Sequence, residues 1–215
     1  MAESKLRITE IFYSLQGETI NLGLPTVFIR LTGCPLRCQY CDTAYAFTGG
    51  QWMPMSEIMA QLSRYKTPYV TVTGGEPLAQ PECLTLLAQL CDQNYQVSLE
   101  TSGALPLASV DPRVRKIMDI KTPDSQEAHR NDWQNLQCLD GKDQVKFVIC
   151  SEQDYLWSKQ QLVERQLNEV CEVLFSPSHE QLMPAQLAEW VLRDQLPVRF
   201  QMQLHKVLWG DQRGK

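Results

Sequence analysis

Two hydrophobic patterns alternate along the chain. Short runs rich in β-branched and aromatic residues predict buried strands, and segments with apolar residues every three or four positions predict amphipathic helices. The expected strands are 7–12, 26–31, 69–73, 96–100, 116–120, 145–150, 173–175 and 198–204. The expected helices are 56–65, with Ser56 as N-cap, a segment opened by Pro81, 152–166 and 183–194.

This alternation indicates βα units and therefore a parallel sheet with helices packed against it. Periodicity alone does not separate an open sheet from a partial barrel, but in both arrangements ligands bind beyond the carboxyl ends of the strands. We expect the polar stretch 121–143 to be a surface excursion. Residues 1–215 are expected to form a single α/β domain.

Composition narrows the class of protein further. The chain has 215 residues, of which 43% are hydrophobic and 21% charged, as in ordinary globular domains. Its net charge of -5, without a basic cluster, argues against nucleic-acid binding. We find no run of 18 apolar residues and no signal peptide in 1–25, so the prediction is a cytoplasmic protein not associated with membranes. In that reducing compartment, closely spaced cysteines favour metal binding or catalysis over disulfides.

The most informative motif is Cys34-Pro-Leu-Arg-Cys38-Gln-Tyr-Cys41, which follows an expected strand. Three thiolates from one loop can converge on one metal centre, yet a structural zinc site needs four ligands and no fourth Cys or His lies nearby. An iron–sulfur cluster with one open iron suits three ligands. Zinc completed from a distant ligand, or three unrelated buried cysteines, are the alternatives.

A second motif, Thr73-Gly-Gly-Glu-Pro77, ends the strand 69–73. Two glycines allow a backbone edge to approach a ligand, and Glu76 can pair with an ammonium group. Taken alone, the motif is also consistent with a tight turn.

Together the two motifs resemble the radical S-adenosylmethionine (SAM) superfamily, with Tyr40 at the aromatic position of its cysteine motif. The resemblance implies a partial (βα) barrel of about six parallel strands and a [4Fe-4S] cluster whose open iron binds SAM. It also implies reductive cleavage of SAM to a 5′-deoxyadenosyl radical, with electrons from a donor such as flavodoxin or ferredoxin.

Further motifs narrow the resemblance. Ser14-Leu-Gln-Gly-Glu18, Arg30, Cys41-Asp-Thr43, Glu100-Thr-Ser-Gly103, Asp119-Ile-Lys-Thr-Pro123, Ser176-Pro177 and Gln203-Leu-His-Lys206 follow in this order. The set is similar to the 7-carboxy-7-deazaguanine synthase family. The implied reaction is a lyase-type ring contraction of 6-carboxy-5,6,7,8-tetrahydropterin, with loss of ammonia and use of Mg²⁺, in queuosine or other 7-deazapurine biosynthesis. A homodimer is also implied.

The resemblance assigns residues to each ligand. It implies cluster ligation by Cys34, Cys38 and Cys41, and Mg²⁺ binding by Thr43, whose hydroxyl suits a hard cation. It implies SAM binding by Tyr40, Cys41, Asp42, Gly74, Gly75, Glu76, Gly103, Asp119, Ile120, Lys121, Phe175, Ser176, Pro177 and Ser178. It implies substrate binding by Leu15, Gln16, Gly17, Glu18, Arg30, Thr101 and His205. Independently of the family, Arg30 offers a planar fork for a carboxylate.

Two features depart from this family. Thr19 stands where members commonly carry glycine, and the C-terminal segment lacks the proline that helps many members to hold substrate. The other cysteines are expected to be reduced packing residues: Cys83, Cys91, Cys138, Cys150 and Cys171. Two other functions stay open at this point: a radical SAM activase that acts on a partner protein, and a zinc-binding interaction module.

Overall fold

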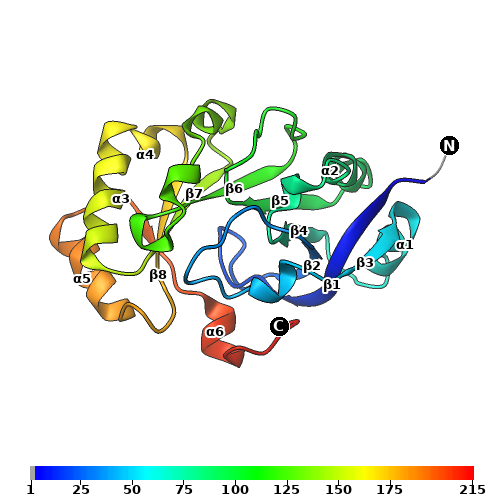
Figure 1. Cartoon of the computed structure of the whole chain (residues 1–215), viewed down its shortest axis with the longest axis horizontal. Helices are drawn as coiled ribbons and strands as arrows, with labels where there is room; N and C mark the ends of the chain where they lie inside the picture. The colour runs from blue at the N-terminus through cyan, green and yellow to red at the C-terminus, as the bar shows by residue number, and fades with distance from the viewer. Residues whose placement is uncertain (1–2) are drawn as a thin grey trace.

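The computed structural model describes residues 3–215 and arranges them around one nine-stranded sheet (Figure 1). The strand order is β3-β1-β2-β4-β5-β6-β7-β8-β9. The strands are β1 (Lys5–Leu15), β2 (Pro25–Leu31), β3 (Gln51–Pro54), β4 (Tyr69–Gly74), β5 (Gln96–Thr101), β6 (Arg115–Ile120), β7 (Gln144–Ile149), β8 (Glu172–Pro177) and β9 (Arg199–Phe200).

From β2 onwards every neighbouring pair in the sheet is parallel. Six of these strands have six or seven residues, and the seventh, β9, has two. The sheet ends at β3 and β9 without closing. The α/β class and the partial barrel of about six parallel strands are therefore confirmed.

The N-terminal edge differs from the expected all-parallel sheet. β1 pairs antiparallel with both β2 and β3, and β3 was not expected at all. β1 and β2 are joined by a short loop, which is the connection that antiparallel neighbours use, whereas parallel neighbours need a longer crossover. The strand expected at 198–204 is also shorter, because the chain enters a helix at Leu204.

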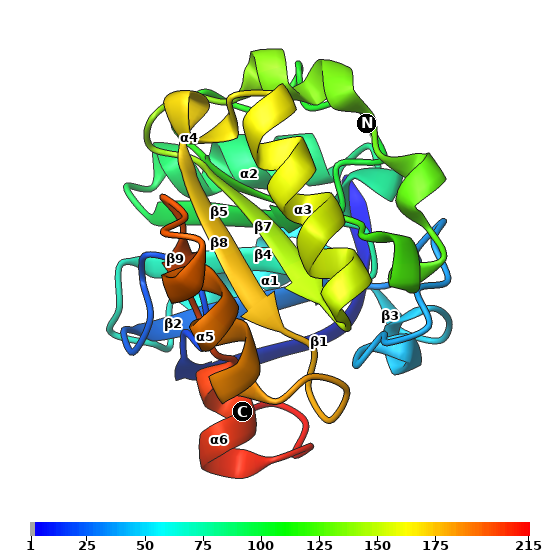
Figure 2. The same ribbon diagram turned by 90° about the vertical axis from the view of Figure 1, so that its left-hand side faces the viewer.

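The helices pack mainly around the outside of the curved sheet, as the two perpendicular views show (Figures 1 and 2). They are α1 (Met55–Leu62), α2 (Cys83–Asp92), α3 (Glu152–Glu164), α4 (Leu167–Val170), α5 (Pro184–Arg193) and α6 (Leu204–Trp209). Ser56 is not the N-cap of α1, because β3 runs directly into the helix and Pro54 occupies that position. The helix expected to reach residue 166 stops at Glu164, since Gln166 has a φ of 50°.

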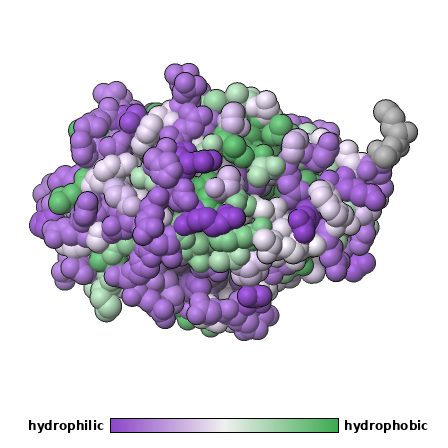
Figure 3. Space-filling model, in the orientation of Figure 1, coloured by the Kyte–Doolittle hydropathy of each residue, from purple (hydrophilic) through white to green (hydrophobic). Residues whose placement is uncertain are grey.

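The core lies between these helices and the strands. β4 and β8 each contain four or more consecutive buried residues, so both faces of these strands are covered. Of the cysteines predicted to pack, Cys83, Cys91, Cys150 and Cys171 are buried. The face seen in Figure 1 is mainly hydrophilic, with hydrophobic surface gathered near its middle (Figure 3).

The segment 121–143 is more ordered than the expected surface excursion. It forms three short 3-10 helices, η3 (Pro123–Ser125), η4 (Ala128–Arg130) and η5 (Trp133–Cys138). Asn135 is buried, donates to the carbonyls of Gly103 and Leu105, and accepts from the amide of Leu107. The segment thus supports the loop that follows β5. None of the helices found in residues 3–215 is both long and apolar enough to cross a membrane.

Candidate active site

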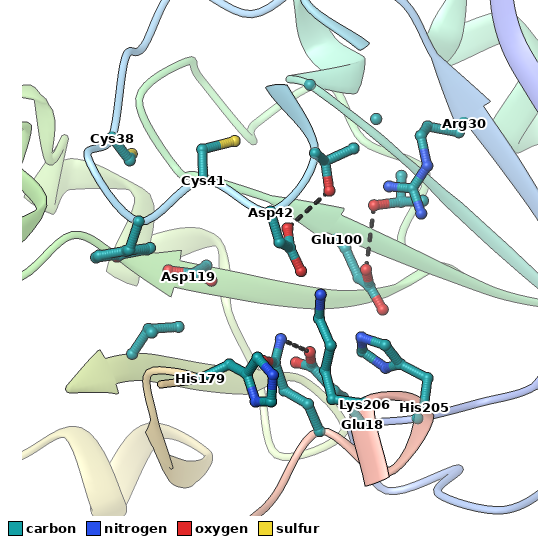
Figure 4. A pocket seen from close by; sticks show the side chains of 18 of the residues that line it. Glu18, Arg30, Cys38, Cys41, Asp42, Glu100, Asp119, His179, His205 and Lys206 are labelled. Carbon is teal, nitrogen blue, oxygen red and sulfur yellow. Dashed lines mark hydrogen bonds between the residues drawn. The ribbon is translucent and has the colours of Figure 1, made fainter. Parts of the chain in front are cut away.

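A cavity of about 540 Å³ opens at the carboxyl ends of the central strands. Its lining comes from the ends of β1, β2, β4, β5, β6 and β7, from the loop 32–50 and from the C-terminal segment. In Figure 4, Cys38, Cys41 and Asp119 lie on one side of it, Arg30 and Glu100 on another, and Glu18, His205 and Lys206 face them. The position agrees with the expectation for ligand sites in parallel sheets.

The cysteine motif contributes three free thiols, all of which line the cavity. One hydrogen bond closes the loop on itself, from the Arg37 guanidinium to the carbonyl of Cys34 (2.7 Å), and another ties it to the segment after β6, from the backbone amide of Gln39 to the carbonyl of Ser125 (3.2 Å). Burial raises the pKa of the Cys38 thiol to about 11. A metal centre bound here would therefore displace protons from these thiols.

The donor set fits a cluster better than a single ion. Among residues 3–215, no three His, Cys, Asp or Glu side chains converge in the way that a single metal ion requires. A [4Fe-4S] cluster is a cube with separate irons, so its three thiolate ligands do not need to meet at one point. Three partly exposed thiols on one cavity wall match that requirement.

The glycine pair lies against the cysteine loop. A Cβ atom on Gly74 would come within 2.6 Å of the carbonyl oxygen of Leu31, and one on Gly75 within 2.2 Å of that of Gly33. The glycines are thus needed so that β4 and the start of the cysteine loop can approach each other. This contact explains their presence without a ligand, although both residues also line the cavity.

Glu76 is fully buried and does not line the cavity. Its carboxylate accepts hydrogen bonds from the hydroxyl of Thr101, from the amide and hydroxyl of Ser102 and from the amide of Leu78. In this structure Glu76 therefore ties the end of β4 to the end of β5.

Arg30 is fixed by a partner that sequence analysis missed. Glu10 and Arg30 are directly opposite in the β1–β2 pair, and Nε of Arg30 donates to Oε1 of Glu10 at 2.7 Å. The hydroxyl of Tyr45 donates to the same oxygen. Because this bond uses only Nε, the terminal guanidinium nitrogens are left for a ligand in the cavity.

Gln16 and Glu18 follow β1 and are nearly buried. The Gln16 amide donates to Glu100 (3.3 Å) and to Thr71 (3.1 Å). Burial and the nearby Glu18 carboxylate raise the pKa of Glu100, despite opposing effects of Lys146 and Arg30. Burial alone would also raise the pKa of Glu18, but Lys146 and His205 lower it, and the net shift is downward.

A chain of ion pairs crosses the cavity between the cofactor and substrate regions expected from sequence. Nζ of Lys146 lies 2.6 Å from Oε2 of Glu18 and 3.1 Å from Oδ2 of Asp119. Nζ of Lys121 lies 2.8 Å from Oδ1 of Asp119. Burial opposes ionisation of Asp119, yet Lys121 and Lys146 together lower its pKa. Both carboxylates therefore stay ionised as hydrogen-bond acceptors.

Helix α6 brings His205 into the cavity. The amide of Leu204 donates to the carbonyl of Gly17 at 2.9 Å, and a Cβ atom on Gly17 would lie 2.3 Å from Nδ1 of His205. Burial lowers the pKa of His205, with Glu18 acting in the opposite direction. The glycine thus allows the histidine ring to pack directly over the loop after β1.

Asp42 and Thr43 form a pair of oxygen donors next to Cys41. The hydroxyl of Thr43 donates to Oδ1 of Asp42 at 2.7 Å, so the Thr43 oxygen keeps lone pairs for a cation. Tyr40 also lines the cavity, and its buried hydroxyl has no hydrogen-bond partner among the described residues.

Comparison with known proteins identifies the family. The sequence profile of the radical SAM superfamily matches residues 28–124. The 7-carboxy-7-deazaguanine synthase of Chlorobaculum tepidum is 47% identical over 99% of this chain and 98% of its own length. The enzyme of the same name from Koribacter versatilis is 42% identical over 95% of this chain and 97% of its own. This chain belongs to the 7-carboxy-7-deazaguanine synthase family.

A solved structure supports the fold of this family member. QueE from Escherichia coli superposes with a TM-score of 0.78 at 22% sequence identity, covering 94% of this chain and 95% of that one. SuiB from Streptococcus suis, at 15% identity and a TM-score of 0.59, matches 82% of this chain but 48% of its own length. Both results concern the fold alone.

The structure brings most of the family-implied site residues to one cavity. Those that line it are Leu15, Gln16, Gly17, Glu18, Arg30, Cys34, Cys38, Tyr40, Cys41, Asp42, Thr43, Gly74, Gly75, Thr101, Asp119, Lys121, Ser178 and His205. Six do not line it: Glu76, Gly103, Ile120, Phe175, Ser176 and Pro177. Ile120, Phe175 and Ser176 have buried side chains, so any contact with a ligand would come from their backbone or from a shift of the chain.

Two cavity residues, Lys146 and Tyr45, were missed from sequence, and two more, Glu100 and Gln203, stood in the motifs above without an assigned role. Glu10, which does not line the cavity, bonds to Arg30 and Tyr45, and Gln203 bonds to Glu18. One signal was available: Lys146 is a lone charge in the otherwise apolar run Val145–Cys150. A single charge within a buried strand indicates a buried partner, because an unpaired charge is costly to bury.

Proposed function

We propose that this protein converts 6-carboxy-5,6,7,8-tetrahydropterin to 7-carboxy-7-deazaguanine with release of ammonia, a step in queuosine and 7-deazapurine biosynthesis. The observation that carries this conclusion is identity of 47% over nearly the full length of a 7-carboxy-7-deazaguanine synthase. The cavity agrees with this function, because the thiols of the cysteine motif lie on one wall and the charged groups of Arg30, Glu18 and Glu100 lie across the cavity from them.

When bound, the [4Fe-4S] cluster and SAM of this superfamily would supply the radical chemistry of the reaction. Cys34, Cys38 and Cys41 would hold the cluster, and Asp119 with Lys121 would contact SAM. The chain's own contribution is to place the two molecules next to each other in one cavity.

Arg30 would bind the substrate carboxylate through its terminal guanidinium nitrogens, which the bond to Glu10 orients. Gln16 would hydrogen-bond through its amide group and Glu18 would accept hydrogen bonds at the guanine-like edge of the pterin, with Thr101 and His205 as further contacts. Thr43 would bind Mg²⁺ through its hydroxyl, next to the carboxylate of Asp42.

The reaction itself is the test. Purified protein is reconstituted anaerobically with iron and sulfide, then given SAM, dithionite, Mg²⁺ and the carboxylated tetrahydropterin. Mass spectrometry should detect 7-carboxy-7-deazaguanine, and its formation should fall at least 100-fold in Cys38→Ala. The matched control is Cys91→Ala on α2, away from the cavity, which should retain activity.

The same preparation tests two other functions. About four irons and no zinc per chain are expected; one zinc and no iron would favour an interaction module instead. A preparation that cleaves SAM but leaves the pterin unchanged would favour an activase that acts on a protein.

Three further features belong to the proposal. We expect a homodimer, electrons from a flavodoxin or ferredoxin, and action in the reducing cytoplasm as one domain of residues 1–215. All eight cysteines are free, as a reducing compartment requires. Sedimentation at micromolar concentration tests the dimer, and replacing dithionite with each reduced carrier in turn tests the donor.

A further inference from the structure

Lys146 occupies a position between the two ligand regions. It lies on β7 directly beside Asp119 of β6 in the register of the parallel pair. Its side chain is only 12% exposed, and its ammonium bonds to both Asp119 and Glu18. Asp119 belongs to the region assigned above to SAM and Glu18 to the region assigned to the pterin.

Each carboxylate is held at both oxygens. In Glu18, Oε2 receives Lys146 and Oε1 receives the amide of Gln203 at 2.9 Å. In Asp119, Oδ2 receives Lys146 and Oδ1 receives Lys121. Lys146 is the one group among the described residues that bonds to both carboxylates, so the orientation of one is linked to that of the other.

The charges around Lys146 keep it protonated. Burial would lower its pKa, but Glu18, Asp119 and Glu100 raise it well above its ordinary value. The other charged groups around the two carboxylates are Lys121 beside Asp119 and His205 near Glu18, with Arg30 acting on Glu100. Without Lys146, three carboxylates would share a cavity with less compensating charge.

We propose, on the basis of the function proposed above, that Lys146 is a positioning residue that couples SAM binding to pterin binding. A ligand that bonds to Glu18 restricts the Lys146 side chain, and this in turn restricts Asp119. The second ligand then meets a carboxylate that is already ordered. Its binding therefore costs less conformational entropy of the protein side chains. Each ligand therefore tightens the binding of the other.

The test measures pterin affinity with and without SAM. Equilibrium dialysis of cluster-reconstituted protein is done without reductant, so that no turnover occurs. In the wild-type protein we expect SAM to lower the Kd of the pterin by about fivefold or more. Lys146→Met keeps the length and apolar stem of the side chain but removes the charge, and the ratio of the two Kd values should fall to about one. Lys146→Arg should restore part of the ratio.

Two controls separate coupling from general damage. Lys121→Met removes the ion pair with Asp119 and the cation–π contact with Tyr40 but no contact with Glu18, so it should weaken SAM binding and leave the ratio above threefold. Lys159→Met removes a surface ion pair with Asp194 on the outer helices and should change neither affinity nor ratio. Circular dichroism and iron content confirm that each variant is folded and loaded.

The outcomes are distinct. A ratio in Lys146→Met within twofold of the wild-type ratio, or a wild-type ratio of one, overturns the role of Lys146 while leaving the proposed function intact. Wild-type protein that binds SAM but no pterin overturns the proposed function, and this inference with it. A lower ratio in Lys146→Met with partial recovery in Lys146→Arg supports the inference.

Discussion

At the scale of single residues, unusual backbone positions explain two features of the substrate loop. Thr19 stands where family members commonly have glycine, and its φ of 67° lies in the left-handed region. A β-branched residue is strained there, whereas glycine is not. Gly17, two positions earlier, is needed for a different reason, which is the close approach of His205.

Thr19→Gly should change the free energy of unfolding by less than about 1 kcal/mol, because relief of strain offsets the lost packing and chain entropy. The matched control is Thr26→Gly, another buried threonine with one local hydrogen bond but an ordinary strand conformation. It should cost about 2 kcal/mol. Urea unfolding measures both, and equal costs would contradict the argument from strain.

Gly17→Ala should raise the KM for the pterin at least tenfold and cost about 1–3 kcal/mol of stability, since the added methyl group displaces His205. The control is Gly141→Ala, where an added Cβ meets no heavy atom within 4 Å. Steady-state kinetics measures the KM of each variant, and urea unfolding measures its stability. A normal KM in Gly17→Ala would mean that His205 does not contact the substrate.

At the scale of elements, the C-terminal segment is fixed to the loop after β1. Gln201, just after β9, donates to the carbonyl of Thr19 (3.0 Å) and accepts from its amide (2.8 Å). Gln203 and Leu204 add bonds to Glu18 and Gly17. The segment between β9 and α6, together with the first residue of α6, thus holds one wall of the cavity.

Gln201→Leu should destabilise the protein by about 1–3 kcal/mol, because it leaves the amide of the buried Thr19 without a partner and removes one of the two hydrogen bonds to its carbonyl, the other coming from the amide of Leu22. We also expect KM to rise more than kcat falls, since the loop positions binding groups. Gln186→Leu, on the exposed side of α5, serves as control and should stay within about 0.5 kcal/mol of wild type. Unchanged stability in Gln201→Leu would contradict the assigned role.

At the scale of the whole molecule, the sheet collects charges from distant segments into one buried network. Glu100, Asp119 and Lys146 come from three strands and Glu18 from the loop after β1, and they meet because the sheet curves around the cavity. Such a network makes the stability of the fold depend on pH, because its carboxyl groups titrate differently in the folded and unfolded chains.

Asp119→Asn and Glu100→Gln should affect stability with opposite pH dependence. The pKa of Asp119 is below its ordinary 3.8, so its stabilising effect is present above that pH and is lost as the pH falls through the folded value. The deficit of Asp119→Asn should therefore shrink as the pH falls below about 4. Glu100 has a raised pKa, so its ionisation costs stability above its ordinary 4.5, and Glu100→Gln should gain relative to wild type as the pH rises. Urea unfolding from pH 3 to 7 tests both signs, and parallel curves for the two variants would contradict the network.

The features of this protein that depend on short stretches of chain could be predicted from its sequence. The positions of six parallel strands and of the motifs at their carboxyl ends follow from hydrophobic periodicity, which depends on neighbours within a few residues. The three cysteines lie within one loop, so their common location did not depend on the fold. The family followed from motifs of the same short range.

Tertiary structure alone decided which side chains meet. Lys146 and Glu18 are 128 positions apart, and Gln201 and Thr19 are 182 apart. The ends of β1, the two-residue β9 and α6 were misjudged for a related reason, because short elements at sheet edges are formed by pairing and packing rather than by their own periodicity. Local pattern can place a residue on a strand, but the partner across a cavity depends on sheet order and curvature, which are set by contacts throughout the folded chain.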